Sequence, residues 1–138
     1  MDLYNREIIS FSISKDAGLE SMWPAFTEAI EKTSDCKYRR LFHTDQGSLY
    51  QSGIYVSTLK ENKIIQSMSR KGNCHDNSVM ENFFGLLKQE IYYGHEFNSY
   101  EELEQAIVDY IRYYNEERIK KKLGWLSPVQ FRLKNEAA

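Results

Sequence analysis

The sequence predicts an α/β fold, and three features of the chain support this. Ile9, Phe11 and Ile13 alternate with serines, a pattern typical of a strand with one buried face. Apolar residues recur at helical spacing over residues 18–33, and again over two further stretches, 78–93 and 99–114. The order strand, helix, strand, strand and two long helices therefore indicates a mixed α/β domain with three short strands.

The first half of the chain holds the predicted strands. The helix that follows the first strand is expected to begin near Met22, because Pro24 is tolerated in the first turn of a helix. A second strand is predicted over residues 38–44, and it ends at a turn-forming cluster, residues 45–48. A short helix over residues 51–62, a third strand over 63–68 and a loop over 69–77 complete this half.

The second half is predicted to be helical. Ser78 and Ser99 are each followed three residues later by glutamate, which is the pattern of a capping box. Three lysines at 120–122 follow the second long helix, and Ser127-Pro128 is a plausible start for a last short helix through Phe131. We expect one domain over residues 1–138, with the sheet and first long helix in about 1–95 and the C-terminal helices and basic tail in 96–138.

Length and composition exclude several classes of protein. The 138 residues are 41% hydrophobic and 28% charged, which is typical of a globular chain and not of a disordered one. No apolar run approaches the length of a membrane span, and no membrane partner is expected. The net charge of -2 means that any affinity for nucleic acid must come from local patches. Two cysteines make no disulfide framework, so a cytoplasmic location is expected.

Two carboxylates have a context that suits metal binding. Asp45 ends a predicted strand, and Glu81 lies in the first turns of a predicted helix, with 35 residues between them. Such a pair of hard oxygen ligands suits Mg²⁺, and two ions there would clamp the attacking and leaving oxygens of a phosphodiester. Each residue also has a plainer interpretation: Glu81 as part of a capping box, and Asp45 as a turn aspartate that bonds its own backbone.

Several basic residues are candidates for contact with DNA. Lys88 lies two helical turns after Glu81 on the same face, with Gly85 between them leaving that face open. His43 shares a strand face with Asp45, where it could orient the aspartate or contact DNA, although a packed strand histidine is the commoner case. Arg118 and Lys120, Lys121 and Lys122 could lie on phosphates or form a solvated charge run. A zinc site from Cys36, His43, Cys74 and His75 matches no established spacing.

Three ordered blocks of the sequence resemble those of a known family. Residues 42–50, FHTDQGSLY, are similar to the His-Ser-Asp-x-Gly-x-x-Tyr block of DDE transposases of the insertion-sequence-three family, which resemble the retroviral integrase catalytic core. Residues 72–84 match the family's Asp-Asn-x-x-x-Glu-x-Phe-Phe block, and residues 114–128 its closing Tyr-Asn-x-x-Arg and Leu-Gly-x-x-Ser-Pro signature. The resemblance covers roughly residues 2–132.

This resemblance implies a ribonuclease-H-like fold and Mg²⁺- or Mn²⁺-dependent nicking and strand transfer of DNA. It places the second and third acids of the triad at Asp45 and Glu81, and a DNA-contacting lysine at Lys88. DNA at transposon ends and targets is the implied substrate, in the bacterial cytoplasm at the nucleoid.

The resemblance also has departures. The strand with the family's first aspartate lies upstream of the block that Asp2 matches, so we expect a partial domain lacking the first core strand. Such a fragment should be marginally stable, inactive alone and weak in metal binding, with Asp76 the first candidate for a substitute ligand. Lys120 stands where many relatives carry histidine. The alternative functions are a non-catalytic remnant that binds DNA, self-associates or pairs with full-length transposase, and a plain α/β domain with neither role.

Overall fold

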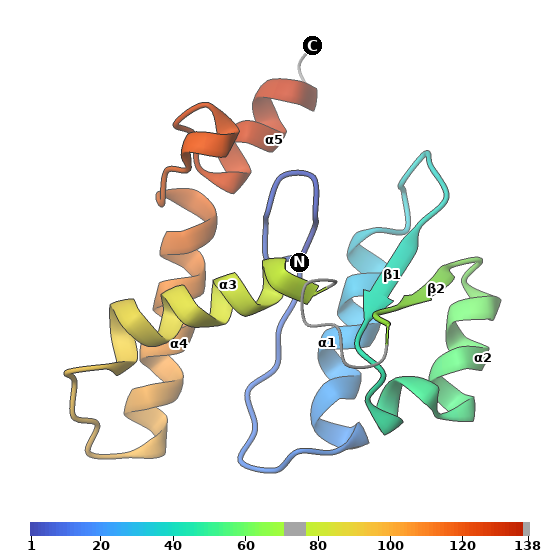
Figure 1. The fold of residues 1–138 in the computed structure, drawn as a ribbon, viewed down its shortest axis with the longest axis horizontal. Coiled ribbons are helices and arrows are strands. Elements are labelled where there is room, and N and C mark those ends of the chain that lie inside the picture. Colours follow the sequence, from blue (N-terminus) through green and yellow to red (C-terminus); the bar gives the residue numbers. More distant parts are fainter. Residues whose placement is uncertain (71–76, 137–138) are drawn as a thin grey trace. The chain divides into compact units, whose positions relative to one another are not determined.

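The computed structural model describes residues 1–70 and 77–136, and these fall into two compact units. One unit joins residues 1–9 to residues 79–136, and the other comprises residues 10–70 with 77–78. Figure 1 shows the elements of both units, and each unit has its own hydrophobic core. The first long helix, predicted to group with the sheet, belongs to the same unit as the C-terminal helices. The single-domain prediction itself stays a prediction.

A small parallel sheet organises the unit of residues 10–78. Helix α1 (Leu19–Lys32) precedes β1 (Leu41–Thr44), and the 3-10 turn η1 (Ser48–Gln51) and α2 (Gly53–Glu61) lead to β2 (Ile65–Met68). The two strands pair in parallel, in a register that sets His43 opposite Ser67. Aromatic and aliphatic side chains of both helices, with one from the residue before β2, form the core of this unit: Phe26, Ile30, Tyr55, Leu59 and Ile64. The α/β class is thus confirmed, with both later strands shorter than predicted.

The predicted strand over residues 9–13 is wrong, because no ladder forms there among the described residues. Its polar groups have other partners. The Asn115 side chain accepts a hydrogen bond from the Ile8 N–H at 2.8 Å and donates one to the Ile8 carbonyl at 3.0 Å. The Ser10 hydroxyl donates to the Ala25 carbonyl of α1 at 2.7 Å. Phe11, expected on the buried face, is exposed. The described sheet therefore has two strands and not three.

Helix α1 begins at Leu19, earlier than the sequence predicts. Pro24 therefore lies in its second turn, where it removes the N–H that would bond the carbonyl of Glu20. Glu20 is exposed, so water can satisfy that carbonyl. The predicted start near Met22 is therefore wrong, because a proline beyond the first turn is tolerated where the freed carbonyl faces solvent.

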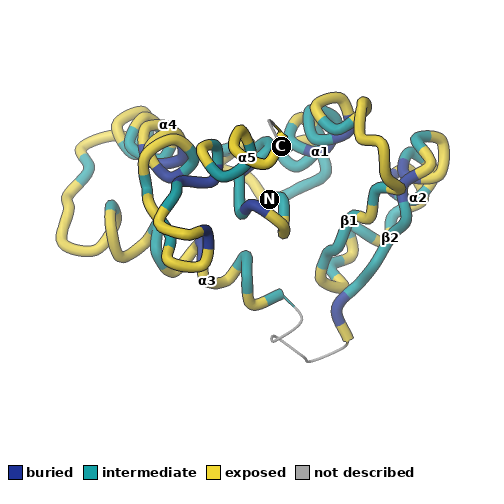
Figure 2. Tube along the Cα trace, turned by 90° about the horizontal axis from the view of Figure 1, so that it is seen from above, coloured by how far each residue is buried: buried dark blue, intermediate teal, exposed yellow. Residues whose placement is uncertain are grey.

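The other unit is helical. It contains α3 (Ser78–Leu87), the π-helical turn η3 (Lys88–Tyr92), α4 (Tyr100–Glu116), the 3-10 turn η4 (Lys121–Leu123) and α5 (Pro128–Glu136). The predicted cap of α4 is confirmed, since Ser99 accepts from the Glu102 N–H at 3.1 Å. Ser127 and Gln130 cap α5 reciprocally. Helix α4 carries a buried stripe and an exposed one (Figure 2), and the buried stripe meets Phe83 of α3 at Tyr110 and Tyr114.

No helix in the described part of the chain combines the length and apolar character that a bilayer span requires.

Candidate active site

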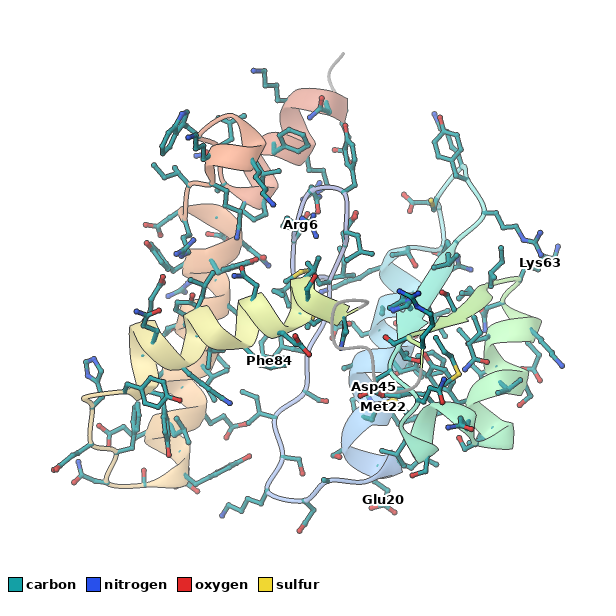
Figure 3. All side chains as sticks on the ribbon, viewed as in Figure 1. Arg6, Glu20, Met22, Asp45, Lys63 and Phe84 are labelled. Atoms are coloured by element: carbon teal, nitrogen blue, oxygen red, sulfur yellow. The ribbon has the colours of Figure 1, made fainter. Side chains whose placement is uncertain are left out.

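Asp45 lies at the carboxyl end of β1, exposed to solvent, with one oxygen fixed by a turn (Figure 3). Its Oδ1 accepts a hydrogen bond from the Gly47 N–H at 2.9 Å, so the turn interpretation is confirmed for that oxygen. A Cβ at position 47 would lie 3.0 Å from the same oxygen, which explains the need for glycine. Among the described residues no group donates to Oδ2. The carboxylate is therefore oriented and still has an open oxygen.

The segment after β1 is anchored to the end of β2. The Gln46 side chain donates to the Ser69 carbonyl at 3.0 Å, and the Gln66 side chain donates to the Tyr50 carbonyl at 2.6 Å. Burial, and then the nearby Asp45 carboxylate, raises the pKa of Tyr50. Because parallel strands end at the same edge of a sheet, these bonds hold Asp45 at that edge.

His43 is engaged inside the sheet. Its Nδ1 lies 2.9 Å from the Ser67 hydroxyl, and its Nε2 lies 3.1 Å from the hydroxyl of buried Ser69. A neutral imidazole has one donor and one acceptor, and two hydroxyls can satisfy both. The structure therefore places His43 as a packed strand histidine. Its predicted contact with DNA stays a prediction, and that contact would need one of these bonds to break.

One face of α3 carries the predicted helix residues. Glu81 and Lys88 are both exposed and lie seven residues apart, two turns along the helix. A Cβ at Gly85 would meet nothing within 4 Å, so the face between them is open, as the sequence predicts. Phe84 adds a ring that is 50% exposed and extends from α3 (Figure 3). The opposite face buries Phe83 in the core. This stripe can approach an extended anionic ligand closely.

The guanidinium of Arg118 forms an ion pair with the Glu90 carboxylate. Its Nε lies 3.1 Å from each carboxylate oxygen of Glu90, and its Nη2 lies 2.6 Å from Glu90 Oε1. Hydrogen bonds from Arg118 hold the pKa of Glu90 below its usual value. The guanidinium was predicted to lie on DNA, and the structure shows an internal partner. A role in DNA contact stays a prediction.

The three lysines after α4 have different surroundings. The Lys120 ammonium lies 3.9 Å from the centroid of the Tyr114 ring. Burial, followed by the nearby charges of Arg118 and Arg6, lowers its pKa to about 8. Lys121 and Lys122 are exposed in η4. Of this basic run, the latter two are thus available to a phosphate backbone without rearrangement.

The predicted metal ligands come from different units. Asp45 belongs to the unit of residues 10–78 and Glu81 to the helical unit, so their meeting at one ion stays a prediction. Both are exposed carboxylates, the hard oxygen donors that Mg²⁺ prefers. Within the described ranges no group of three or more His, Cys, Asp or Glu residues could hold a metal. Cys74, His75 and Asp76 lie outside the described residues.

Sequence reasoning missed two residues that organise the helical unit, Glu90 and Asn115. Asn115 holds both backbone groups of Ile8, and Glu90 holds Arg118. Asn115 and Arg118 belong to the closing signature, so that signature could have indicated a joint contact. Nothing in the local pattern singles out Glu90, because it is one of many helix glutamates.

Comparison with known proteins identifies the family of the chain. Two family models, each described as an integrase core domain, match residues 1–74 and 81–135. The chain belongs to the integrase core family. The predicted resemblance to insertion-sequence-three transposases is confirmed with it, because relatives within the family carry such names.

Three relatives illustrate the match. A Haemophilus influenzae protein named as an uncharacterized transposase-like protein is 47% identical over 95% of this chain and 60% of its own length. The putative transposase InsK for insertion sequence element IS150 of Escherichia coli is 44% identical over 96% of this chain and 46% of its own. Transposase InsF for IS3A of E. coli is 36% identical over 99% and 48%. This integrase core chain spans about half the length of these relatives.

Proposed function

We propose that this integrase core acts in DNA transposition, through a ribonuclease-H-like site that nicks DNA and transfers the resulting 3′-hydroxyl strand. The observation that carries the proposal is the exposed stripe of α3, with Glu81, open Gly85 and Lys88 on one face. Family membership supports DNA as the ligand.

The proposed reaction gives a role to the two carboxylates, to the turn that holds one of them, and to Lys88. Asp45 and Glu81 would hold Mg²⁺ or Mn²⁺, which when bound polarises a phosphodiester and activates the attacking oxygen. The Gly47 N–H fixes one Asp45 oxygen and leaves the other toward solvent. Lys88 lies about 10.5 Å from Glu81 along the helix axis, taking seven residues at ~1.5 Å each. At that span Lys88 would bind a phosphate other than the reacting one.

Binding of a fluorescent DNA duplex, followed by anisotropy between 50 and 200 mM salt, tests the DNA-binding part. Lys88→Ala should weaken binding and reduce the slope of log K against log salt by about 1, because one phosphate contact is lost. The matched control is Lys60→Ala, an exposed lysine on another helix, α2. Equal slopes for the two variants would refute the assignment of Lys88.

Nicking of supercoiled plasmid with Mn²⁺ tests the catalytic part. Product that forms with the parent chain and disappears with Glu81→Gln, but not with the surface control Glu31→Gln, would support it and would overturn the expectation that the chain is inactive alone. Salt-dependent binding without any nicking would favour the second candidate, a non-catalytic DNA-binding or transposase-pairing chain. Exposed Lys121 and Lys122 are the observation that supports this second candidate.

A further inference from the structure

We propose that Arg118 is a positioning residue: by holding Glu90 it fixes the π-helical turn η3, and so sets where Lys88 leaves α3. The inference rests on the proposed function for the role of Lys88, and it assigns to Arg118 a part other than direct contact with DNA. Its basis is the Arg118–Glu90 geometry within the helical unit.

The turn that carries Lys88 is irregular. Helix α3 is regular to Leu87, and Lys88 begins the π-helical turn, in which the Tyr93 N–H donates to the Lys88 carbonyl at 2.8 Å. A π turn is rare and is less favourable than a continued α-helix, so other contacts must hold it. Helix ends also fray readily. The backbone of Lys88 therefore depends on what holds η3 in place.

The Arg118–Glu90 pair is the contact that can do this. Glu90 is the middle residue of η3, and the fork of Arg118 meets its carboxylate with three short N–O distances of 2.6–3.1 Å. The two side chains are only 22% and 31% exposed, so solvent screens them less than an ordinary surface pair. A forked arginine–carboxylate pair fixes orientation as well as distance.

Arg118 is itself fixed to the core. Its N–H donates to the Tyr113 carbonyl at 2.8 Å at the end of α4, and the neighbouring turn of α4 buries Tyr114 against Phe83. The turn η3 is thus tied to α4 through this pair, beside the packing of Ile91 on the core and the contact of Glu90 with Tyr110. Loss of that pair should leave α3 folded around Phe83 while Lys88 loses its defined position.

A purely structural ion pair in the same unit provides the control. Arg132 Nε lies 2.7 Å from Glu7 Oε2, and this pair does not touch η3. Arg118→Gln and Arg132→Gln should both lower stability. Arg118→Gln alone should lower the salt slope of DNA binding, by about 1, as Lys88→Ala does.

A double-mutant cycle separates positioning from direct contact. In the Lys88→Ala background, Arg118→Gln should cause no further loss of DNA affinity, because there is no ammonium left to position. Additive losses would show that Arg118 itself binds phosphate and would overturn the proposal. Arg118→Lys keeps the charge without the fork, and it should behave like Arg118→Gln. Full binding by Arg118→Lys would also overturn the proposal.

Amide exchange gives a readout that does not depend on DNA. The Tyr93 N–H should lose protection in Arg118→Gln and keep it in Arg132→Gln. Unchanged protection in Arg118→Gln would overturn the proposal whatever the DNA result. If the parent chain binds no DNA while Tyr93 responds as expected, the proposed function fails but the coupling of Arg118 to η3 stands.

Discussion

Lys120 gives the sharpest test of the electrostatics in the helical unit. Its ammonium sits over Tyr114, with Arg118 and Arg6 as the nearby like charges and Glu90 as the opposing one. The pKa of Lys120 falls from 10.5 to about 8 in the folded chain. The folded state therefore releases this proton at lower pH than the unfolded state does. Between pH 8 and 10.5 the unfolded chain binds more protons, so stability must rise with pH across that window.

The size of this effect follows from the pKa and the exposure. The full drop in pKa would be worth at most ~3 kcal/mol. The side chain is only half-buried, so solvent screening reduces the expected gain between pH 7 and 9.5 to about 1 kcal/mol. Lys120→Met keeps an unbranched stem over Tyr114 and removes the titrating group. We expect the gain in the parent chain to be absent in this variant.

Urea unfolding at pH 7, 8, 9 and 9.5 measures the difference. Other titrating groups are common to both proteins, and they cancel when the parent and Lys120→Met are compared at each pH. The control variant is Lys121→Met, which removes an exposed lysine from the next position and should follow the parent. Parallel pH curves for the parent and Lys120→Met would refute the argument that burial disfavours the charged form.

Three further changes have expected outcomes. Leu59→Ala, at a side chain 1% exposed in the core of residues 10–78, should lower the free energy of unfolding by about 3 kcal/mol in urea titration. Asn115→Ala leaves both backbone groups of Ile8 unpaired, and it should cost about 2 kcal/mol and remove the protection of the Ile8 amide from exchange. Gly85→Ala places a methyl group in open space on a helix, so it should raise the free energy of unfolding by about 0.5–1 kcal/mol. It should also weaken DNA binding, and unaltered binding would show that DNA does not approach that face.

The helices could be predicted because their signals are local. The cap at Ser99, the apolar period of α4 and the Ser127-Pro128 start all operate within a few residues, and the structure has each of them. The open face at Gly85 also follows from helical spacing alone. Local pattern fixed the exposure of Glu81 and Lys88, because a helix with one buried stripe turns its other face to solvent.

The first strand could not be predicted by the same means. Alternation at Ile9, Phe11 and Ile13 shows only that a strand is compatible with the side chains, and a strand also needs a partner for its backbone groups. In this chain the backbone N–H and carbonyl of Ile8, just before that run, pair with the side chain of Asn115, more than 100 residues away. A local pattern of side chains does not show that a distant side chain will take these backbone hydrogen bonds. The π turn at Lys88 is similar, because its cause is the distant Arg118.

The family signature in this chain therefore carries structural as well as chemical information. Its closing block meets the first residues of the chain in the helical unit, where Asn115 holds Ile8, and Arg132, just after that block, holds Glu7. Arg118, from the closing block, holds the turn that follows Glu81 and Lys88. Arg118 was a candidate for DNA contact, and its observed partner is a carboxylate of the same chain, through which it shapes the end of the helix that presents the exposed stripe. The hydrogen-bond and ion-pair partners of a motif residue within its own chain should therefore be known before that residue is assigned a contact with substrate.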